Sequence, residues 1–157
     1  MTELALLPPA KRLTIVENIG TPADGDSLAG QNVNNFPAGA LFYVQAAHRL
    51  YELRKGLDAL VVATSRLNVI DGVGSSDAAG RFVAVQQFGT GALSGGSVAL
   101  DGFDLTNAGF FLVSYITPAG TQGFLRAAKT AANSVTAVSS SGSDTSTVLV
   151  VFVEASG

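Results

Sequence analysis

The chain contains 157 residues, of which 47% are hydrophobic and 13% are charged, and it carries a net charge of −3. It contains no cysteine, which excludes disulfides, thiolate catalysis and cysteine metal sites. The charged share is about half that of an ordinary soluble domain, and the mean hydropathy is +0.37. Such a chain either spans a membrane or covers much of its surface against other chains.

Membranes and nucleic acids are both disfavoured as partners. The longest apolar run, Val148–Val153, has the length of a strand, whereas a spanning helix needs about 20 apolar residues. Met1–Pro9 lacks a basic stretch before its short apolar patch, so we expect no signal peptide. The net charge is negative, so the sequence does not predict the basic surface that binds nucleic acid. We therefore predict docking to other protein chains.

Residues 1–38 predict an extended N-terminal arm, because prolines and turn formers recur too often for a helix. Arg12–Val16 is rich enough in β-branched residues to pair as a strand. An apolar patch followed by a stiff Pro-Pro stem is suited to docking into a lattice or a neighbouring protomer, with a disordered tail as the alternative. The candidate interface residues here are Leu4, Leu6, Leu7, Pro8 and Pro9.

Residues 39–157 predict one all-β domain. In its first part we expect strands at Ala40–Gln45, Arg49–Arg54, Leu60–Ala63, Leu67–Ile70 and Arg81–Val85. In its second part we expect strands at Ser97–Phe103, Phe110–Ile116, Gly123–Lys129, Ser134–Val138 and Thr147–Glu154. A helix over residues 46–63 competes with the hairpin around Ala46–His48, but Gly56 disfavours it. The predicted fold is a β-sandwich or jelly roll preceded by the arm.

Tyr43 and Tyr51 are further candidate interface residues. Period-2 geometry places Phe42 and Val44 on one side of their strand and Tyr43 on the other. Tyr43 and Tyr51 could therefore cover a second surface, such as the arm or a neighbouring subunit. Core packing with each hydroxyl at the edge of the core is the alternative interpretation.

Catalytic and metal-binding patterns are weak in this sequence. The single histidine, His48, falls in a predicted turn, and no nucleophile elbow is present. Asp24–Asp26 and Asp101–Asp104 could contribute calcium ligands, but neither has the full acidic loop spacing, and Asp-Gly also favours tight turns. We expect no cofactor, no metal and no enzymatic activity.

Two stretches resemble tailed-phage structural proteins. Residues Gly39–Val44, Arg49–Leu53, Asn68–Ile70 and Gly80–Val83 are similar to a module of tail fibres and head-decoration proteins. In that module the position of Phe82 is often Trp. The Ser/Asp/Thr-rich segment Ala137–Val148 resembles the last hairpin of the β-sandwiches in such proteins.

The resemblance implies a virion protein on the capsid surface, made in the host cytoplasm. We predict a capsid decoration or cement protein that binds the major capsid protein as a symmetric homo-oligomer, a trimer. A tail fibre or receptor-binding tip that uses the Asp71–Gly80 loop is the alternative. A small glycan hydrolase is a third hypothesis. It would need a pair of carboxylates, one of which has a raised pKa.

Overall fold

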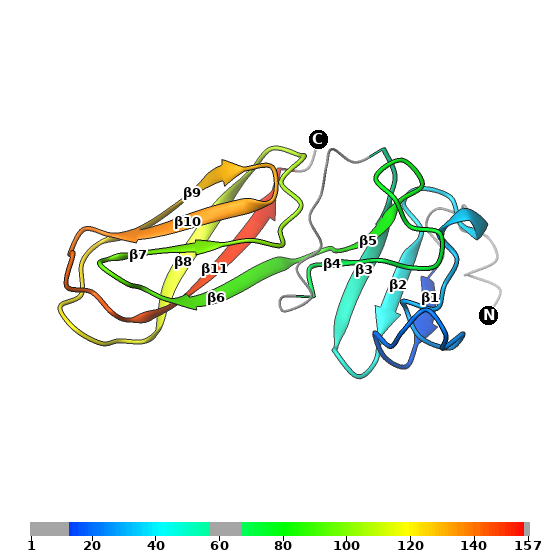
Figure 1. Cartoon of the computed structure of the whole chain (residues 1–157), viewed down its shortest axis with the longest axis horizontal. Coiled ribbons are helices and arrows are strands. Elements are labelled where there is room, and N and C mark those ends of the chain that lie inside the picture. The colour runs from blue at the N-terminus through cyan, green and yellow to red at the C-terminus, as the bar shows by residue number, and fades with distance from the viewer. Residues whose placement is uncertain (1–12, 57–66, 156–157) are drawn as a thin grey trace. The chain divides into compact units, whose positions relative to one another are not determined.

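Among the residues that the structure describes, β-strands make up the regular structure, apart from one 3-10 turn, η2 (Val33–Asn35). The computed structural model, drawn in Figure 1, describes residues 13–56 and 67–155. The all-β prediction is confirmed. Contacts divide the chain into two compact units, which meet in sequence between Val85 and Gln86.

The first unit is built on a five-stranded sheet in the order β1-β2-β3-β5-β4. β1 runs parallel to β2, and the other pairs are antiparallel. The strands are β1 (Leu13–Val16), β2 (Leu41–Val44), β3 (Arg49–Arg54), β4 (Val69–Ile70) and β5 (Arg81–Ala84). They confirm four predicted strands within a residue or two at each end and shorten the predicted Leu67–Ile70. The predicted strand at Leu60–Ala63 lies outside the described residues.

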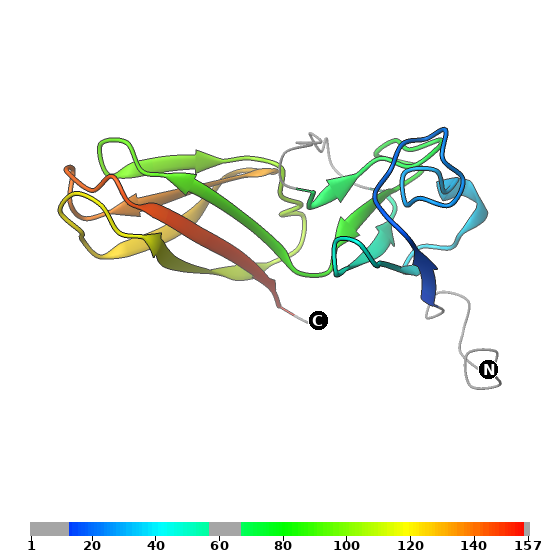
Figure 2. The same cartoon turned by 90° about the horizontal axis from the view of Figure 1, so that it is seen from below.

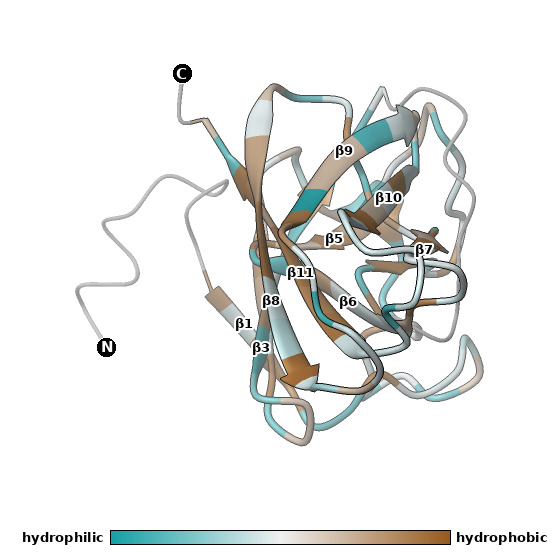
Figure 3. Cartoon of the chain, turned by 90° about the vertical axis from the view of Figure 1, so that its left-hand side faces the viewer, coloured by the Kyte–Doolittle hydropathy of each residue, from teal (hydrophilic) through white to brown (hydrophobic). Residues whose placement is uncertain are grey.

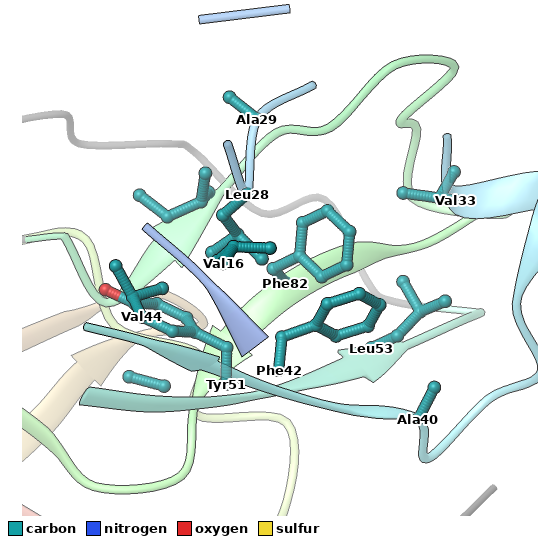
Figure 4. Packing of buried hydrophobic residues seen from close by; sticks show 12 residues of the cluster. Val16, Leu28, Ala29, Val33, Ala40, Phe42, Val44, Tyr51, Leu53 and Phe82 are labelled. Carbon is teal, nitrogen blue, oxygen red and sulfur yellow. The ribbon is translucent and has the colours of Figure 1, made fainter. Parts of the chain in front are cut away.

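Phe42 is at the centre of the first unit's core, as Figure 4 shows. Its ring centroid lies 4.9 Å from that of Phe36 and 4.8 Å from that of Phe82, both in edge-to-face geometry. Such aromatic pairs stabilise a core beyond the area that they bury.

Residues between β1 and β2 complete this core, and this differs from the arm that we predicted over residues 1–38. Leu28 and Val33 are fully buried there. The backbone amides of Leu28 and Ala29 donate to the carbonyls of Asn18 and Ile19, each at 2.9 Å. This turn-rich segment folds back on itself, because its few apolar residues pack into the core beside the sheet. The chain divides after residue 85 and not after residue 38.

The β2–β3 connection is a hairpin, as predicted. Its turn ends at His48, which has a positive φ of 51°, and the amide of His48 donates to the Gln45 carbonyl (3.2 Å). The competing helix is not present in the described part of that range, residues 46–56.

The second unit is a β-sandwich of two antiparallel three-stranded sheets, β7-β10-β9 and β6-β11-β8 (Figure 2). The strands are β6 (Gln87–Ala92), β7 (Ser97–Leu100), β8 (Gly109–Thr117), β9 (Leu125–Ala131), β10 (Ser134–Ser139) and β11 (Thr147–Glu154). Both sheets contribute side chains to one core, formed by Leu93, Leu100, Phe103, Leu105, Val135, Ala137, Val148, Val150 and Phe152. The sandwich is therefore the correct one of the two predicted folds for this unit, since a jelly roll has eight strands.

Strand β6 was not predicted, because Gly89 and Gly91 interrupt its sequence and glycine weakens a strand. Gly91 is required by packing between the sheets. A Cβ at this position would lie 2.8 Å from Leu100 Cδ2 and from Val98 Cγ2. The absence of a side chain allows β7 to approach β6 closely.

Candidate protein-binding surfaces

The outer face of the β6-β11-β8 sheet is apolar. Along β8, Phe110, Leu112 and Ile116 are 54%, 56% and 51% exposed. Phe111, Val113 and Tyr115 alternate with this outward-facing set and pack against the core of the sandwich. Figure 3 shows β8 as hydrophobic over most of its length. A sheet with one face on a core ordinarily places polar side chains on the other, and β8 does not follow this pattern.

Strand pairing aligns these side chains with those of β11. Val151 is paired with Leu112, and Val153 is paired with Phe110. On its other side Val151 is paired with Phe88 of β6. We call the outward-facing side chains of β8 and β11 the β8 face; it consists of Phe110, Leu112, Ser114, Ile116, Leu149, Val151 and Val153.

The opposite sheet of the same sandwich provides an internal comparison. Its exposed outward residues are small, polar or charged: Ser97, Ala99, Arg126, Ala128 and Thr130. Thr136, paired with Ala128, belongs to the same surface. The two outer surfaces of one sandwich therefore differ in chemistry, and the contrast marks the β8 face as the unusual one.

The first unit also exposes apolar side chains on its sheet. Leu13 and Ile15 of the edge strand β1 are 40% and 59% exposed, and Val85 is 47% exposed. Ile15 is paired with Tyr43, which is paired with Leu50, and the Val85 amide donates to the Leu50 carbonyl (2.9 Å). These five residues, Leu13, Ile15, Tyr43, Leu50 and Val85, form what we call the β1 face.

The structure separates the two tyrosines that we predicted as interface residues. Tyr43 is half-buried on the β1 face, opposite Phe42 and Val44, as the period-2 argument predicts. Tyr51 instead lies fully buried in the core, and its hydroxyl donates to the Leu67 carbonyl (2.7 Å). Tyr51 thus follows the alternative interpretation, in which the phenol packs inside with its hydroxyl satisfied. The predicted arm residues Leu4, Leu6, Leu7, Pro8 and Pro9 lie outside the described residues.

His48 and Asp24–Asp26 lie in turns, and Asp101–Asp104 lies in an irregular loop. The His48 ring lies near the Tyr43 hydroxyl (Nδ1 to Oη, 3.4 Å) and is exposed. Asp24 Oδ1 accepts the Asp26 amide (3.1 Å), and Asp104 Oδ1 accepts the Thr106 hydroxyl (2.6 Å). Within residues 13–56 and 67–155, no three His, Cys, Asp or Glu side chains gather as metal ligands would.

A buried carboxylate, Asp144, joins the loops at one end of the sandwich. Its Oδ2 lies 2.7 Å from the Tyr115 hydroxyl and accepts the Gly123 amide (3.3 Å). Its Oδ1 accepts the Ser146 amide (3.0 Å). These bonds connect the β8–β9 loop to the β10–β11 loop.

The environment of Asp144 favours its ionised form. Burial alone would raise the pKa of Asp144, but hydrogen bonds from Ser146, Tyr115 and Ser139 outweigh this effect and hold the pKa well below its usual range. A general acid needs the opposite, a raised pKa that retains the proton near neutral pH. The geometry therefore indicates a structural acceptor.

Sequence reasoning missed the β8 face, although the sequence contains a signal for it. Residues 105–125 carry no charged side chain, and an uncharged stretch of that length around a strand is unusual for a solvated sheet. Apolar residues occupy positions 110–113 without alternation, so the period-2 pattern could not tell which of them face outward.

In the part of the chain that the structure describes, there is no helix long and apolar enough to cross a membrane. Comparison of the chain with protein-family models, with curated protein sequences and with solved structures finds no match in any of the three.

Proposed function

We propose that this chain is a structural protein of a virus particle, a capsid decoration or cement protein that binds the major capsid protein and acts as a symmetric homo-oligomer. The observation that carries the proposal is the exposure of apolar side chains on a sheet of each unit, at Leu13 and Ile15 and at Phe110 and Leu112. Large exposed apolar surfaces usually mark protein–protein contacts. The resemblance of residues 39–83 and 137–148 to phage structural modules supports the virion assignment.

The β1 face is the surface that we assign to the major capsid protein. β1 is the edge strand of its sheet, and it follows the apolar residues Leu4–Leu7 closely in sequence. An edge strand can extend its sheet by pairing with another chain, and the flanking apolar residues would add buried area. A contact repeated around a symmetric oligomer stabilises a shell by mass action, because it binds only the assembled lattice.

We expect purified wild-type chain to bind saturably to capsids that lack it and to sediment with them. Ile15→Lys places a charge on the edge strand of the β1 face, and a charge buried without a partner is strongly unfavourable. We expect this variant to bind at least about tenfold more weakly. The matched control is Asn35→Lys, an exposed site elsewhere in the first unit, which should bind like the wild type. Failure of the wild-type chain to sediment with capsids contradicts the proposal.

A receptor-binding tip is the second candidate function. It is favoured by the Asp71–Gly80 loop, which side-chain contacts hold in one conformation. Arg81 forms ion pairs with Asp71 at the start of the Asp71–Gly80 loop (Nε to Oδ1, 2.9 Å) and with Asp77 in its second half (Nη1 to Oδ1, 2.6 Å). Within the loop, the Gly72 amide donates to the Ser75 hydroxyl (2.8 Å). A loop fixed in this way loses little conformational entropy when it binds a ligand. Particles of this kind would carry the chain on the tail only.

A further inference from the structure

We propose that copies of this chain bind one another through the β8 face. The inference deepens the homo-oligomer part of the proposed function and rests on that part alone. Its test needs no virus component, so it stands or fails separately from capsid binding.

The absence of charged residues is the first argument that a second copy of the chain covers the β8 face. Among the outward-facing residues that the structure describes on β8 and β11, none is charged. A partner with a charged surface would lose hydration at this face and find no complementary group. A second copy presents the same neutral surface, so two faces meet without repulsion. Complementary charges commonly make the contact between two unlike chains specific. The β8 face has no charged residue that could do so.

Shape is the second argument. Two sheets pack well when their strands run within about 30° of each other, because each sheet has the same hand of twist. Two copies of one sheet meet this condition when their strands are aligned. If two β8 strands cross antiparallel with Val113 of each at the centre, Leu112 of one copy faces Ser114 of the other. Phe110 then faces Ile116. The small Ser114 leaves room for the larger Leu112 of the other copy, and such alternation of size is what interdigitating sheets require.

The dimensions of the face set the strength of the contact. A nine-residue strand is about 30 Å long, and the three strands β6, β11 and β8 together are about 14 Å wide, so the β8 face and the outer side of β6 together cover about 400 Å². A standard interface buries about 800 Å² on each partner. This area is therefore sufficient for a weak, concentration-dependent contact between two copies.

The test is the mass of the full chain in solution, measured by light scattering or sedimentation over a range of concentrations. We expect the wild type to exceed the 15.9 kDa of one chain as the concentration rises. Leu112→Lys should raise the dissociation constant at least about 100-fold. Ala128→Lys, on the opposite outer sheet surface, should not change it. A wild type that stays monomeric throughout, or an oligomer that Leu112→Lys leaves intact, overturns the inference.

A second measurement avoids the possibility that the lysine variant fails to fold. Because the chain has no cysteine, Ser114→Cys introduces a single thiol in the middle of the β8 face. A short bismaleimide should join two Ser114→Cys chains rapidly, and it should not join Ala128→Cys chains at the same rate. Equal rates for the two variants contradict self-contact through this face.

Discussion

Phe42→Ala should lower the free energy of unfolding of the first unit by about 3–5 kcal/mol. Phe42 is fully buried and lies between the rings of Phe36 and Phe82. Its removal leaves a cavity that the sheet on one side and the β1–β2 segment on the other cannot both close. Denaturant unfolding measures the loss. The control is Leu41→Ala, which truncates the neighbouring side chain on the other face of β2 and should cost much less.

The same variant tests whether residues 13–38 belong to a folded unit. The amides of Leu28 and Ala29 are bonded within that segment, so their hydrogen exchange should accelerate together with that of the sheet in Phe42→Ala. Fast exchange at both amides in the wild type would mean that the segment is an extended arm, as the sequence predicted, and not part of the core.

Gly96→Ala should destabilise the sandwich by about 2–5 kcal/mol. Gly96 has a φ of +78°, which costs an L-residue about 1–2 kcal/mol. In addition, an added Cβ would collide with the Ser141 carbonyl oxygen in the β10–β11 loop, and crowding of this kind costs about 1–3 kcal/mol. The Gly96 carbonyl also accepts the Ser139 amide (2.7 Å), so the backbone cannot shift without losing that bond.

Gly95 provides the matched control for this substitution. Its φ of +60° is similarly unfavourable for alanine, but nothing lies within 4 Å of the position that a Cβ would take. Gly95→Ala should therefore cost only the backbone strain, about 1–2 kcal/mol. Thermal or denaturant unfolding measures the stability lost in each variant, and the difference between the two losses is the effect of the contact with Ser141. Equal losses would show that a Cβ at Gly96 does not collide with Ser141.

Sequence patterns predicted strands well where the local signal is strong. Arg49–Arg54 alternates charged and apolar residues except at the adjacent Leu50 and Tyr51, and β3 has those bounds. Val148–Val153 is a continuous apolar run, and the predicted strand Thr147–Glu154 matches β11. Prediction failed for β6, because the reason for Gly91 lies in another strand, at Val98 and Leu100. Long-range packing of this kind leaves no local signal.

The division of the chain and the binding surfaces were harder to predict for a similar reason. Leu28 and Val33 are isolated apolar residues in a polar, turn-rich segment, and only the folded core shows that they are buried. On β8 the exposed Leu112 and the inward-facing Val113 are adjacent apolar residues. Pairing with β11 decides which of them faces outward, and the strand's own sequence does not.

The abundance of this chain in purified virus particles tests the central claim most directly. Quantitative mass spectrometry of intact particles gives its ratio to the major capsid protein. We predict many copies, in a fixed ratio to that protein. Absence of the chain from the particles contradicts a structural role in the virion, and a few copies that purify with the tail contradict the capsid assignment in favour of the receptor-binding tip.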